Sequence, residues 1–580
     1  AGALTLPVVS RLHAAGGGSI HPYLYTLQPD SMYVGWWTDG GGASSVEFGV
    51  APDQLDTVVP AGDRFMGIGY HYHRAQLSGL SPSTYYYYCV RSGGESSDVY
   101  RFRTPPPLGT KSGRFRILIL GDNQIQTSER RWAQLAERAV AKIEADYGAA
   151  VEEVVDMVLN IGDQVDYSNN NQWRNMHFEY GRAFNSNVAS MTTIGNHDTY
   201  GDYDLSRYGQ LFNFSHLTYQ GISSPGGNAY YAYQIANILF VHLNSESTSA
   251  MTNPAQGAGS VQRQWVQDIV DAASADSSVD FIISLVHRPY QAEQYIGDIS
   301  GWFRSEIMPV LCQTGKHLLN LGAHHHLYAR GQTRDWPCYH IINGATSWDQ
   351  YWGQSSEADY DDVQKTIAMW AWQLADFDLA AGRMEVSCYA EANVRFPQSE
   401  RWTTRAYNSR LIDSFHRQPG LAAPDRPTIV TPGSGGPGQP NIVNLPFTLE
   451  SSPFSTTAPG EALNSTQFQI AVDSGFVKTR VDLIRDVSNL YGDSGAPDYE
   501  PVDINAGVNI LEYQIAQDAL PNSRYYARLR HRDSNASWSE WSPVYEFTVE
   551  GSTGANPQLS LQKNVFAPGE AVVVGYERED

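Results

Sequence analysis

The sequence predicts a multidomain chain in which a central α/β domain lies between two β-sandwich domains. Three observations predict this architecture. The chain has 580 residues, which is enough for about four domains of ~150 residues. Its hydrophobic pattern changes twice, near residues 109 and 441, and a Pro- and Gly-rich segment precedes the second change. The expected boundaries are 1–108 (sandwich), 109–418 (α/β domain), 419–440 (linker), 441–550 (second sandwich) and 551–580 (a tail or a fragment of a further module).

Residues 1–108 carry short alternating runs separated by Gly, Ser and Pro, which is typical of a β-sandwich. The stretch from Leu77 to Tyr86 leads into the strand-like residues 87–90. It resembles the corner of a fibronectin type III domain, in which a Tyr hydrogen-bonds back to the preceding loop. We therefore expect a fibronectin III-like sandwich here.

The spacing of hydrophobic residues along the sequence changes in the central block. Residues 117–120 form a continuous apolar run, apolar residues then recur at helical spacing from Trp132 to Ile143, and a second apolar run covers 157–161. This pattern predicts a βαβ unit. Further strands are expected at 238–243, 281–286 and 318–321, with helices at 261–272 and 302–311. An α/β domain with buried sheets follows from this alternation.

The second sandwich contains Trp538-Ser-Glu-Trp541-Ser542, which resembles the WSxWS box of fibronectin-like receptor modules. Arg528, Arg530 and Arg532 alternate along one predicted strand. Their guanidinium groups can stack between the two indoles as a cation–π ladder, so we expect a stabilising role and no catalytic one.

Composition limits the partners and the compartment. The net charge of -23, from 39 basic and 62 acidic residues, disfavours binding to nucleic acid. No apolar run reaches the ~18 residues of a transmembrane helix. The chain begins AGALTLPVV without Met and is rich in Tyr, Trp and Gly, so we expect a secreted, periplasmic or cell-surface protein. Four cysteines allow one or two disulfides, Cys312 with Cys338 among the candidate pairs.

Polar clusters follow five of the predicted strands in the central block. Because ligands of open α/β sheets collect at the carboxyl ends of strands, these clusters should converge. Their carboxylates, amide and imidazoles suit two divalent cations such as Zn, Mn or Fe. A carboxylate must lie between two such cations, and we assign that position to Asp163. The candidate metal ligands are Asp122, Asp163, Asn196, His287, His324, His326 and, with a neutral oxygen, Gln124.

The ordered set GD…GD…GNHD…VH…HxH is similar to the calcineurin-like metallophosphoesterase superfamily, and the preceding sandwich resembles the purple acid phosphatase branch. The resemblance implies a core of two packed mixed β-sheets flanked by helices. It implies that Asp122, Asp163 and His326 hold one metal, and that Asp163, Asn196, His287 and His324 hold the other. His197 would then act at the leaving group with Asp198 orienting its ring, and a metal-bound hydroxide would attack phosphorus in line.

Three departures from the family pattern affect these expectations. Gln124 stands where many members have a ligating His. Asp166 occupies the position of the ligating Tyr of the purple enzymes, so a ferric-tyrosinate centre is not expected. The additional His that those enzymes place after VH is missing from residues 291–295, which keeps a phosphodiesterase role open beside a phosphatase role.

Arg288 and Arg330 are candidate phosphate contacts, although either can instead form a salt bridge beside the metal site. Tyr290 is a candidate for the pocket wall.

Two functions from different classes remain. One is a secreted dinuclear-metal phosphoesterase acting on phosphomonoesters or phosphodiesters of small molecules or lipids. The other is an extracellular binding or adhesion protein with an inert metallophosphoesterase-like domain, whose sandwiches contact a surface or a polymer. Metal content and chelator-sensitive activity would distinguish them.

Overall fold

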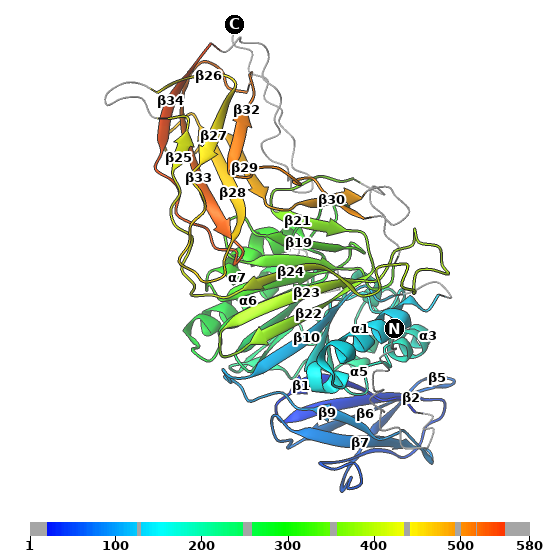
Figure 1. Cartoon of the computed structure of the whole chain (residues 1–580). Coiled ribbons are helices and arrows are strands. Elements are labelled where there is room, and N and C mark those ends of the chain that lie inside the picture. The colour runs from blue at the N-terminus through cyan, green and yellow to red at the C-terminus, as the bar shows by residue number, and fades with distance from the viewer. Residues whose placement is uncertain are drawn as a thin grey trace, which may run out of the picture.

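The computed structural model has three regions arranged end to end, with a β-rich amino-terminal module, a central layered domain and a carboxyl-terminal sandwich (Figure 1). The predicted tail at 551–580 lies, except for residue 551, outside the described residues. The structure describes residues 20–124, 129–246, 258–348, 356–433, 441–493, 500–517 and 519–551.

The first large sheet contains ten strands and runs through two of the predicted domains. Its inner strands β10, β11 and β12 are parallel, whereas β22, β23 and β24 pair antiparallel beside β10. The order is β24 (Arg410–Arg417), β23 (Arg383–Ala390), β22 (Ala371–Asp378), β10 (Arg114–Leu120), β11 (Met157–Asn160), β12 (Ser190–Thr192), β1 (Tyr23–Gln28), β2 (Ser31–Thr38), β6 (Tyr70–Ser78) and β5 (Gly62–Gly67).

The amino-terminal module shares this sheet, because β1 pairs in parallel with β12 through Tyr25 and Ser190. Its second sheet has the order β4 (Thr57–Pro60), β3 (Ser44–Gly49), β7 (Tyr85–Ser92) and β8 (Glu95–Ser96), with β9 (Tyr100–Arg103) paired to β7. The expected tyrosine corner is present, since the main-chain N–H of Ser81 donates to Tyr86 Oη (2.9 Å). The module is therefore the predicted sandwich, but it is fused to the core through continuous strand pairing.

The second large sheet contains nine strands and is also mixed. Strands β16, β17, β18 and β20 are parallel and entirely buried. The order is β15 (Tyr231–Ile235), β16 (Ile238–Leu243), β17 (Phe281–Val286), β18 (His317–Gly322), β20 (Tyr339–Asn343), β19 (Tyr328–Gln332), β21 (Val363–Ile367), β30 (Leu490–Asp493) and β31 (Pro501–Asp503).

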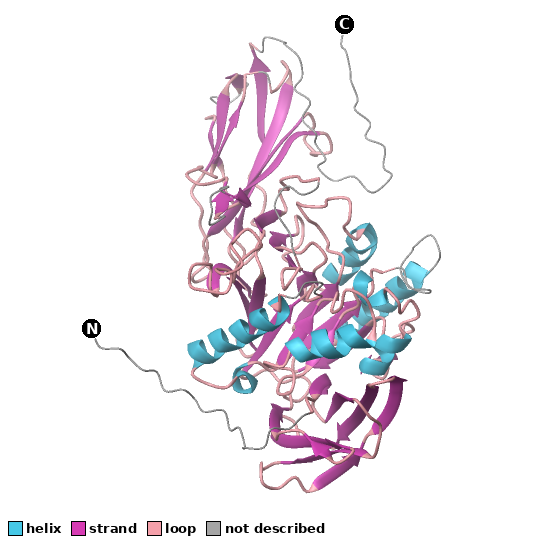
Figure 2. Ribbon diagram, turned by 90° about the vertical axis from the view of Figure 1, so that its right-hand side faces the viewer, coloured by secondary structure: helices cyan, strands magenta, loops and turns pink. Residues whose placement is uncertain are grey.

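The two sheets pack on each other with helices outside (Figure 2). In β10, Ile117 and Ile119 belong to the core between the sheets, while Leu118 and Leu120 belong to the core under α1 (Arg131–Tyr147). This alternation is the two-residue period of a strand buried on both faces. The layered α/β core is thereby confirmed. The remaining helical segments are α2 (Val151–Val154), α3 (Asn170–Gln172), η1 (Trp173–Phe178), α4 (Asn196–Thr199), α5 (Ser206–Leu211), α6 (Ala258–Ala275), η3 (Phe303–Ile307) and α7 (Met308–Cys312), and a small sheet pairs β13 (Thr218–Tyr219) with β14 (Ile222–Ser223).

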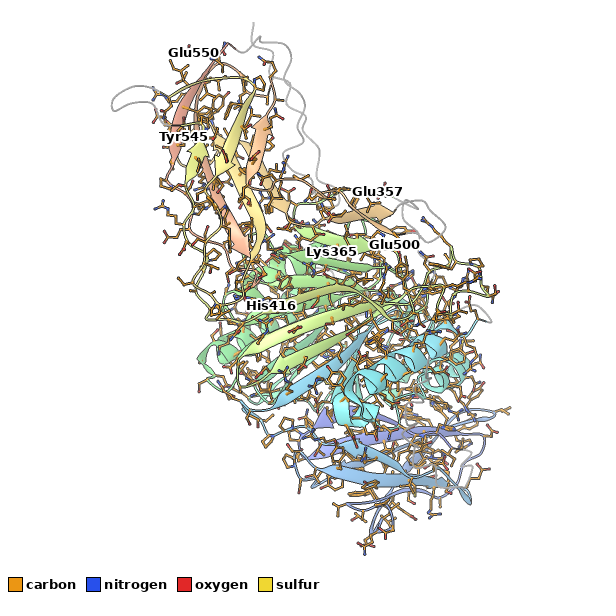
Figure 3. The ribbon with its side chains drawn as sticks, viewed as in Figure 1. Glu357, Lys365, His416, Glu500, Tyr545 and Glu550 are labelled. Atoms are coloured by element: carbon orange, nitrogen blue, oxygen red, sulfur yellow. The ribbon has the colours of Figure 1, made fainter. Side chains whose placement is uncertain are left out.

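The carboxyl-terminal module is a sandwich of two sheets that also reaches into the core. Ile429–Thr431, predicted as linker, is strand β25, because it pairs with β27. The hairpin β30–β31 leaves the module and extends the core sheet beside β21, near Lys365 and Glu500 (Figure 3). The two sheets are β25, β27 (Phe447–Ser451) and β32 (Glu512–Ile515), and β26 (Ile442–Asn444), β34 (Tyr545–Glu550), β33 (Arg524–Asp533), β28 (Leu463–Ala471) and β29 (Thr479–Asp486).

The predicted cation–π ladder is confirmed. The guanidinium carbon of Arg530 lies 4.3 Å from the ring centre of Trp538 and 4.4 Å from that of Trp541. The guanidinium carbon of Arg528 lies 4.1 Å from the ring centre of Trp541, and that of Arg532 lies 4.5 Å from the ring centre of Trp538. The ladder lies on the face of the module that contacts the core, because Trp538 Nε1 donates to the carbonyl oxygen of Arg334 (2.8 Å).

All four cysteines are free and buried, so the candidate pair Cys312 and Cys338 forms no disulfide in this structure. None of the described helices combines the length and the apolar composition that crossing a membrane requires.

Candidate metal centre

The two large sheets bring the predicted ligands together at the carboxyl ends of their strands. Asp122, Asp163 and Asn196 follow β10, β11 and β12, and His287 and the His324–His326 segment follow β17 and β18. The ligand atoms form two groups, and within each group they lie within 4.8 Å of one another. Asp163 belongs to both groups. The groups are Asp122, Asp163 and His326, and Asp163, His287 and His324.

In the first group the Asp122 carboxylate is held from one side only. Its Oδ2 accepts the main-chain N–H of His324 (2.8 Å), whereas its buried Oδ1 has no hydrogen-bond partner and lies 3.4 Å from His326 Nε2. The amide of Gln124 is best satisfied when its nitrogen donates to the carbonyl oxygens of Asp122 (3.1 Å) and Asp163 (2.8 Å). Its oxygen then faces Asp163 Oδ2 and His326 Nε2, which is the orientation that a neutral oxygen ligand needs.

In the second group two imidazoles each present one nitrogen to the cluster. His287 Nδ1 bonds to the carbonyl oxygen of Ile161 (2.8 Å), and its Nε2 lies 3.2 Å from both Asp163 Oδ2 and Asn196 Oδ1. The carbonyl oxygen holds the proton on Nδ1, so Nε2 is the nitrogen that a metal ion would bind in place of its proton. His324 Nε2 contacts Asp298 Oδ2 (2.8 Å), and its Nδ1 is buried without a partner.

Opposite charges dominate the electrostatics of this cluster. Burial alone would lower the pKa of His287, but the carboxylates of Asp163, Asp122 and Glu246 raise it to about 10. Burial would likewise raise the pKa of Asp163, but the charge and hydrogen bond of His287, with His197 and His324, hold it well below its usual range. Asp163 therefore stays ionised, and an anionic oxygen lies at the centre of the cluster.

The backbone around the cluster is strained. Four candidate ligands adopt left-handed φ angles, which are 50° at Asp122, 51° at Asp163, 71° at His324 and 29° at His326. Non-Gly residues in this region cost of order 1 kcal/mol each and concentrate at functional sites. Gly195 is needed because no space is left for a side chain. A Cβ at this position would lie 2.2 Å from Asp163 Oδ1 and 2.3 Å from the main-chain nitrogen of Asp163.

The structure corrects the expected role of Asp198. Its carboxylate accepts the main-chain N–H groups of Gln164 and Gly195 (2.9 Å each), and burial, then the charge of Asp163, raises its pKa to about 7. The His197 ring instead contacts Asp166, since Nδ1 lies 2.9 Å from the Asp166 carbonyl oxygen and 3.3 Å from its Oδ1. Adjacency in sequence does not fix which side chain faces a ring, and the expected contact between Asp198 and the His197 ring is replaced by that of Asp166.

Of the three candidate substrate contacts, Arg288 alone reaches the cluster. Its Nη1 lies 2.9 Å from His324 Nε2 and pairs with Asp298, and its Nε contacts Glu246 Oε1 (3.1 Å). Tyr290 is buried, and its ring centre lies 5.0 Å from that of His340.

Arg330 is engaged elsewhere. It is buried and forms two contacts with the Asp413 carboxylate, at 2.6 and 3.1 Å. Arg330 is therefore a structural ion-pair partner, and this position argues against substrate contact.

Two residues at the site escaped the sequence analysis. Asp166 has a signal in the sequence, because it follows Asp163 by three residues, but its position predicts only the absence of a Tyr ligand. Asp298 carried none, since it lies in a loop after β17 that has no periodic pattern. Its role depends on tertiary contact with His324.

The donor set fits a pair of divalent cations. It combines carboxylate, amide and imidazole donors, which suit Zn, Mn or Fe, and two buried ligand atoms, Asp122 Oδ1 and His324 Nδ1, have no hydrogen-bond partner. Buried polar atoms of native proteins are normally satisfied. A cation in each group would satisfy these atoms, Asp122 Oδ1 in the first group and His324 Nδ1 in the second.

Comparisons with known proteins agree with this geometry. Residues 19–104 match the model of the purple acid phosphatase N-terminal domain, and residues 115–328 match the calcineurin-like phosphoesterase model. No curated protein sequence matches the chain. Among solved structures, purple acid phosphatase PPD1 from yellow lupin (Lupinus luteus) seeds is 15% identical over 69% of this chain and 74% of that chain, with a TM-score of 0.53. PhoD is 13% identical over 68% and 89% of the two chains, with a TM-score of 0.48.

The lupin structure shows the shared fold, and the two family models cover the segments that carry the strand-end motifs and the sandwich before them. Residues 115–328 of this chain are therefore similar to the calcineurin-like phosphoesterases, and residues 19–104 to the N-terminal domain of the purple acid phosphatases.

Proposed function

We propose that this chain hydrolyses phosphoesters at a centre of two divalent cations. The observation that carries the proposal is that Asp163 is shared by two groups of ligand atoms. A shared carboxylate is what two cations ~3.5–4 Å apart require. Asp122, Asp163, His326 and the Gln124 oxygen would hold one cation, and Asp163, Asn196, His287 and His324 the other.

When bound, such a pair polarises a phosphoryl oxygen and lowers the pKa of a bound water. The chain's own residues supply the remaining chemistry. His197 Nε2 lies 4.0 Å from Asp163 Oδ2, and its side chain is 23% exposed, so it can reach a substrate oxygen at the edge of the cluster. Asp166 holds Nδ1 on the opposite side of the ring. We assign His197 to stabilising or protonating the leaving-group oxygen, with Asp166 as its positioning residue.

The surroundings of the cluster favour a diester or a large leaving group over a small dianionic monoester. The one described cationic side chain in contact with the candidate ligands is Arg288, which already pairs with Glu246 and Asp298. Aromatic rings lie beside the site, with Tyr200 at 4.8 Å and Trp348 at 6.3 Å from the ring of His197. These rings offer a surface for a second substituent.

Secretion, periplasmic location or display at the cell surface is a further part of the proposal. It is supported by composition, as is the exclusion of nucleic acid as a partner. A lipid phosphoester and a soluble one remain within the proposed substrate class.

A substrate panel run on metal-free and metal-loaded protein tests the proposal. We expect cleavage of bis(p-nitrophenyl) phosphate that appears with added Zn²⁺ or Mn²⁺ and disappears with chelator, at a rate above that for p-nitrophenyl phosphate. A higher rate for the monoester would contradict the diester preference alone. Protein that binds no metal at this centre and cleaves neither ester would support the adhesion alternative, in which the metallophosphoesterase-like domain is inert.

A further inference from the structure

A second cluster of metal-binding side chains lies in the same domain, at the opposite end of β18. Cys312 ends α7, His317 begins β18, and Cys338 directly precedes β20. One ligand atom from each of the three lies within 4.8 Å of the others. His317 begins β18 and Gly322 ends it, five residues further on, which is a span of about 16 Å at ~3.3 Å per residue. This cluster is therefore separate from the candidate metal centre.

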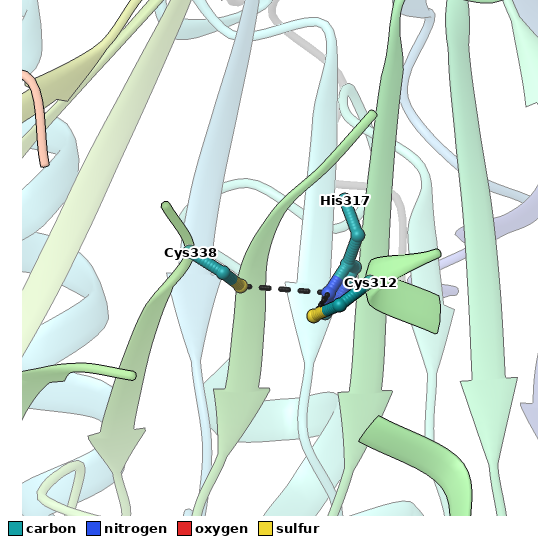
Figure 4. A group of neighbouring side chains, drawn as sticks. All are labelled: Cys312, His317 and Cys338. Carbon is teal, nitrogen blue, oxygen red and sulfur yellow. Dashed lines mark hydrogen bonds between the residues drawn. The ribbon is translucent and has the colours of Figure 1, made fainter. Parts of the chain in front are cut away.

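Both thiols approach the same ring nitrogen. Cys338 Sγ lies 3.4 Å and Cys312 Sγ 3.6 Å from His317 Nδ1, so that the three side chains surround one point (Figure 4). A tetrahedral zinc ion with bonds of ~2.3 Å to sulfur and ~2.05 Å to nitrogen separates these atoms by about 3.6 Å. The observed spacing matches the edge of such a coordination shell.

The other ring nitrogen is already held in place. His317 Nε2 lies 2.8 Å from Ser284 Oγ, which also accepts from Asn320 Nδ2 (3.0 Å). When Ser284 accepts the ring proton, Nδ1 is left unprotonated and directed at the two sulfurs. Ligating histidines are typically fixed through their second nitrogen in this way.

Burial favours an ion over two unbridged thiols. Cys338 is 0%, His317 3% and Cys312 9% exposed. A single ring nitrogen that faces two sulfurs can form a strong hydrogen bond with only one of them, and the Cys338 thiol otherwise has the weak partner Tyr339, whose carbonyl oxygen lies at 3.4 Å. A divalent ion with two thiolates and one neutral imidazole carries no net charge, which suits an interior position. Cys312 is the most exposed of the three, so a water molecule can complete the shell on its side.

We propose that Cys312, His317 and Cys338 bind a thiophilic divalent ion, Zn²⁺ being the one that the geometry fits, in a structural site distinct from the candidate catalytic centre. The ion would join α7, the start of β18 and the segment before β20. That segment receives the carboxyl-terminal module, because Trp538 bonds to the carbonyl oxygen of Arg334 and Tyr339 Oη donates to that of Ser534 (3.0 Å). Metal at this site would therefore stabilise the contact between module and core.

Cobalt substitution of the full chain tests the site without reference to activity. The candidate catalytic centre contains no cysteine, so a thiolate-to-cobalt charge-transfer band in the near ultraviolet reports on the Cys312 and Cys338 ligands alone. Reduced, metal-free protein reloaded with Co²⁺ should show the band, and Zn²⁺ should displace it. We expect Cys338→Ser to abolish the band and to lose about one equivalent of Zn²⁺. The matched control is Cys388→Ser, which alters a buried cysteine that contacts Gln373 (3.4 Å). This variant should keep both the charge-transfer band and the bound Zn²⁺.

Wild-type protein provides a second measurement that does not depend on the folding of a variant. Anomalous scattering at the zinc edge from crystals of the zinc-loaded chain should give a peak bonded to both Sγ atoms. A reloaded protein without the charge-transfer band, or with no anomalous peak at the cluster, would overturn the proposal. A Cys312–Cys338 disulfide in protein isolated without reductant, detected as a mass two hydrogens lower, would overturn it as well.

Discussion

His197 Nδ1 lies 2.9 Å from the carbonyl oxygen of Asp166 and 3.3 Å from its carboxylate, and Asp198 bonds to main-chain N–H groups instead. We expect His197→Ala to keep bound metal but to lower kcat by roughly 10² or more. Asp166→Asn should lower kcat by roughly tenfold with little change in KM, because the ring loses its orienting charge. Steady-state kinetics on the metal-loaded variants checks both values.

A double-mutant cycle separates this coupling from general damage. If Asp166 acts through His197, then adding Asp166→Asn to His197→Ala should cost nothing further. Additive losses would show that Asp166 acts independently of the ring.

Asp163 is the group common to both sets of ligand atoms. Asp163→Ala should therefore remove both metal ions and all activity, whereas Asp122→Ala should lower the affinity of one site more than that of the other. Metal analysis after gel filtration measures the stoichiometry. Because one equivalent is expected at the separate Cys312–His317–Cys338 site, retention of more than one equivalent by Asp163→Ala would contradict the bridging role.

Asp298 lies 2.8 Å from His324 Nε2 on the side away from the cluster. Carboxylates in this position typically improve metal affinity by 10–100-fold. We expect Asp298→Asn to weaken the metal that His324 binds by about that factor, measured as the free-metal concentration at half-maximal activity. Asp268→Asn, which alters a carboxylate that contacts Gln264 on the surface of α6, is the control and should leave the affinity unchanged.

Gly195 allows the close approach of two loops. A methyl group at this position would meet Asp163 Oδ1 at 2.2 Å, so Gly195→Ala must displace the shared carboxylate or its own loop. We expect metal binding to fall by at least tenfold, measured by competition with a chromogenic chelator. Gly40→Ala adds the same methyl group where no atom lies within 4 Å and should bind metal like the wild type.

The parts of the site that follow strands were predictable, and the parts that depend on tertiary packing were not. Asp122, Asp163 and His287 directly follow continuous apolar runs, so the rule that strand ends meet at one sheet edge was sufficient to place them. Asp298 lies in a loop, and no spacing in the sequence connects it with His324.

The same distinction applies to the fold. Alternating and helical periods indicated the α/β core and both sandwiches. They could not show that β1 continues the core sheet through β12, or that the hairpin β30–β31 leaves its own module, because strand pairing between distant segments leaves no local pattern.

Lys365 lies in β21, where the carboxyl-terminal hairpin joins the core sheet (Figure 3). Burial, with the charge of Arg330, lowers its pKa to about 8, and its Nζ donates to Ser488 Oγ (2.6 Å). The folded state therefore binds this proton less tightly than the unfolded chain does. The buried charge of Lys365 therefore destabilises the folded protein at neutral pH. This destabilisation is lost as the pH rises from about 8, the pKa in the folded state, towards 10.5, the pKa in the unfolded chain.

Replacement by Met removes this charge and keeps the length of the side chain. Lys365→Met should raise the free energy of unfolding at pH 7 by up to about 3 kcal/mol, less the value of the lost hydrogen bond. The gain should shrink as the pH approaches 10, because the lysine of the folded state is then already neutral and the remaining penalty disappears above the unfolded pKa near 10.5. Urea denaturation of the two proteins at pH 7 and at pH 10 measures the difference. A gain that is the same at both values would show that Lys365 acts through packing and not through its proton.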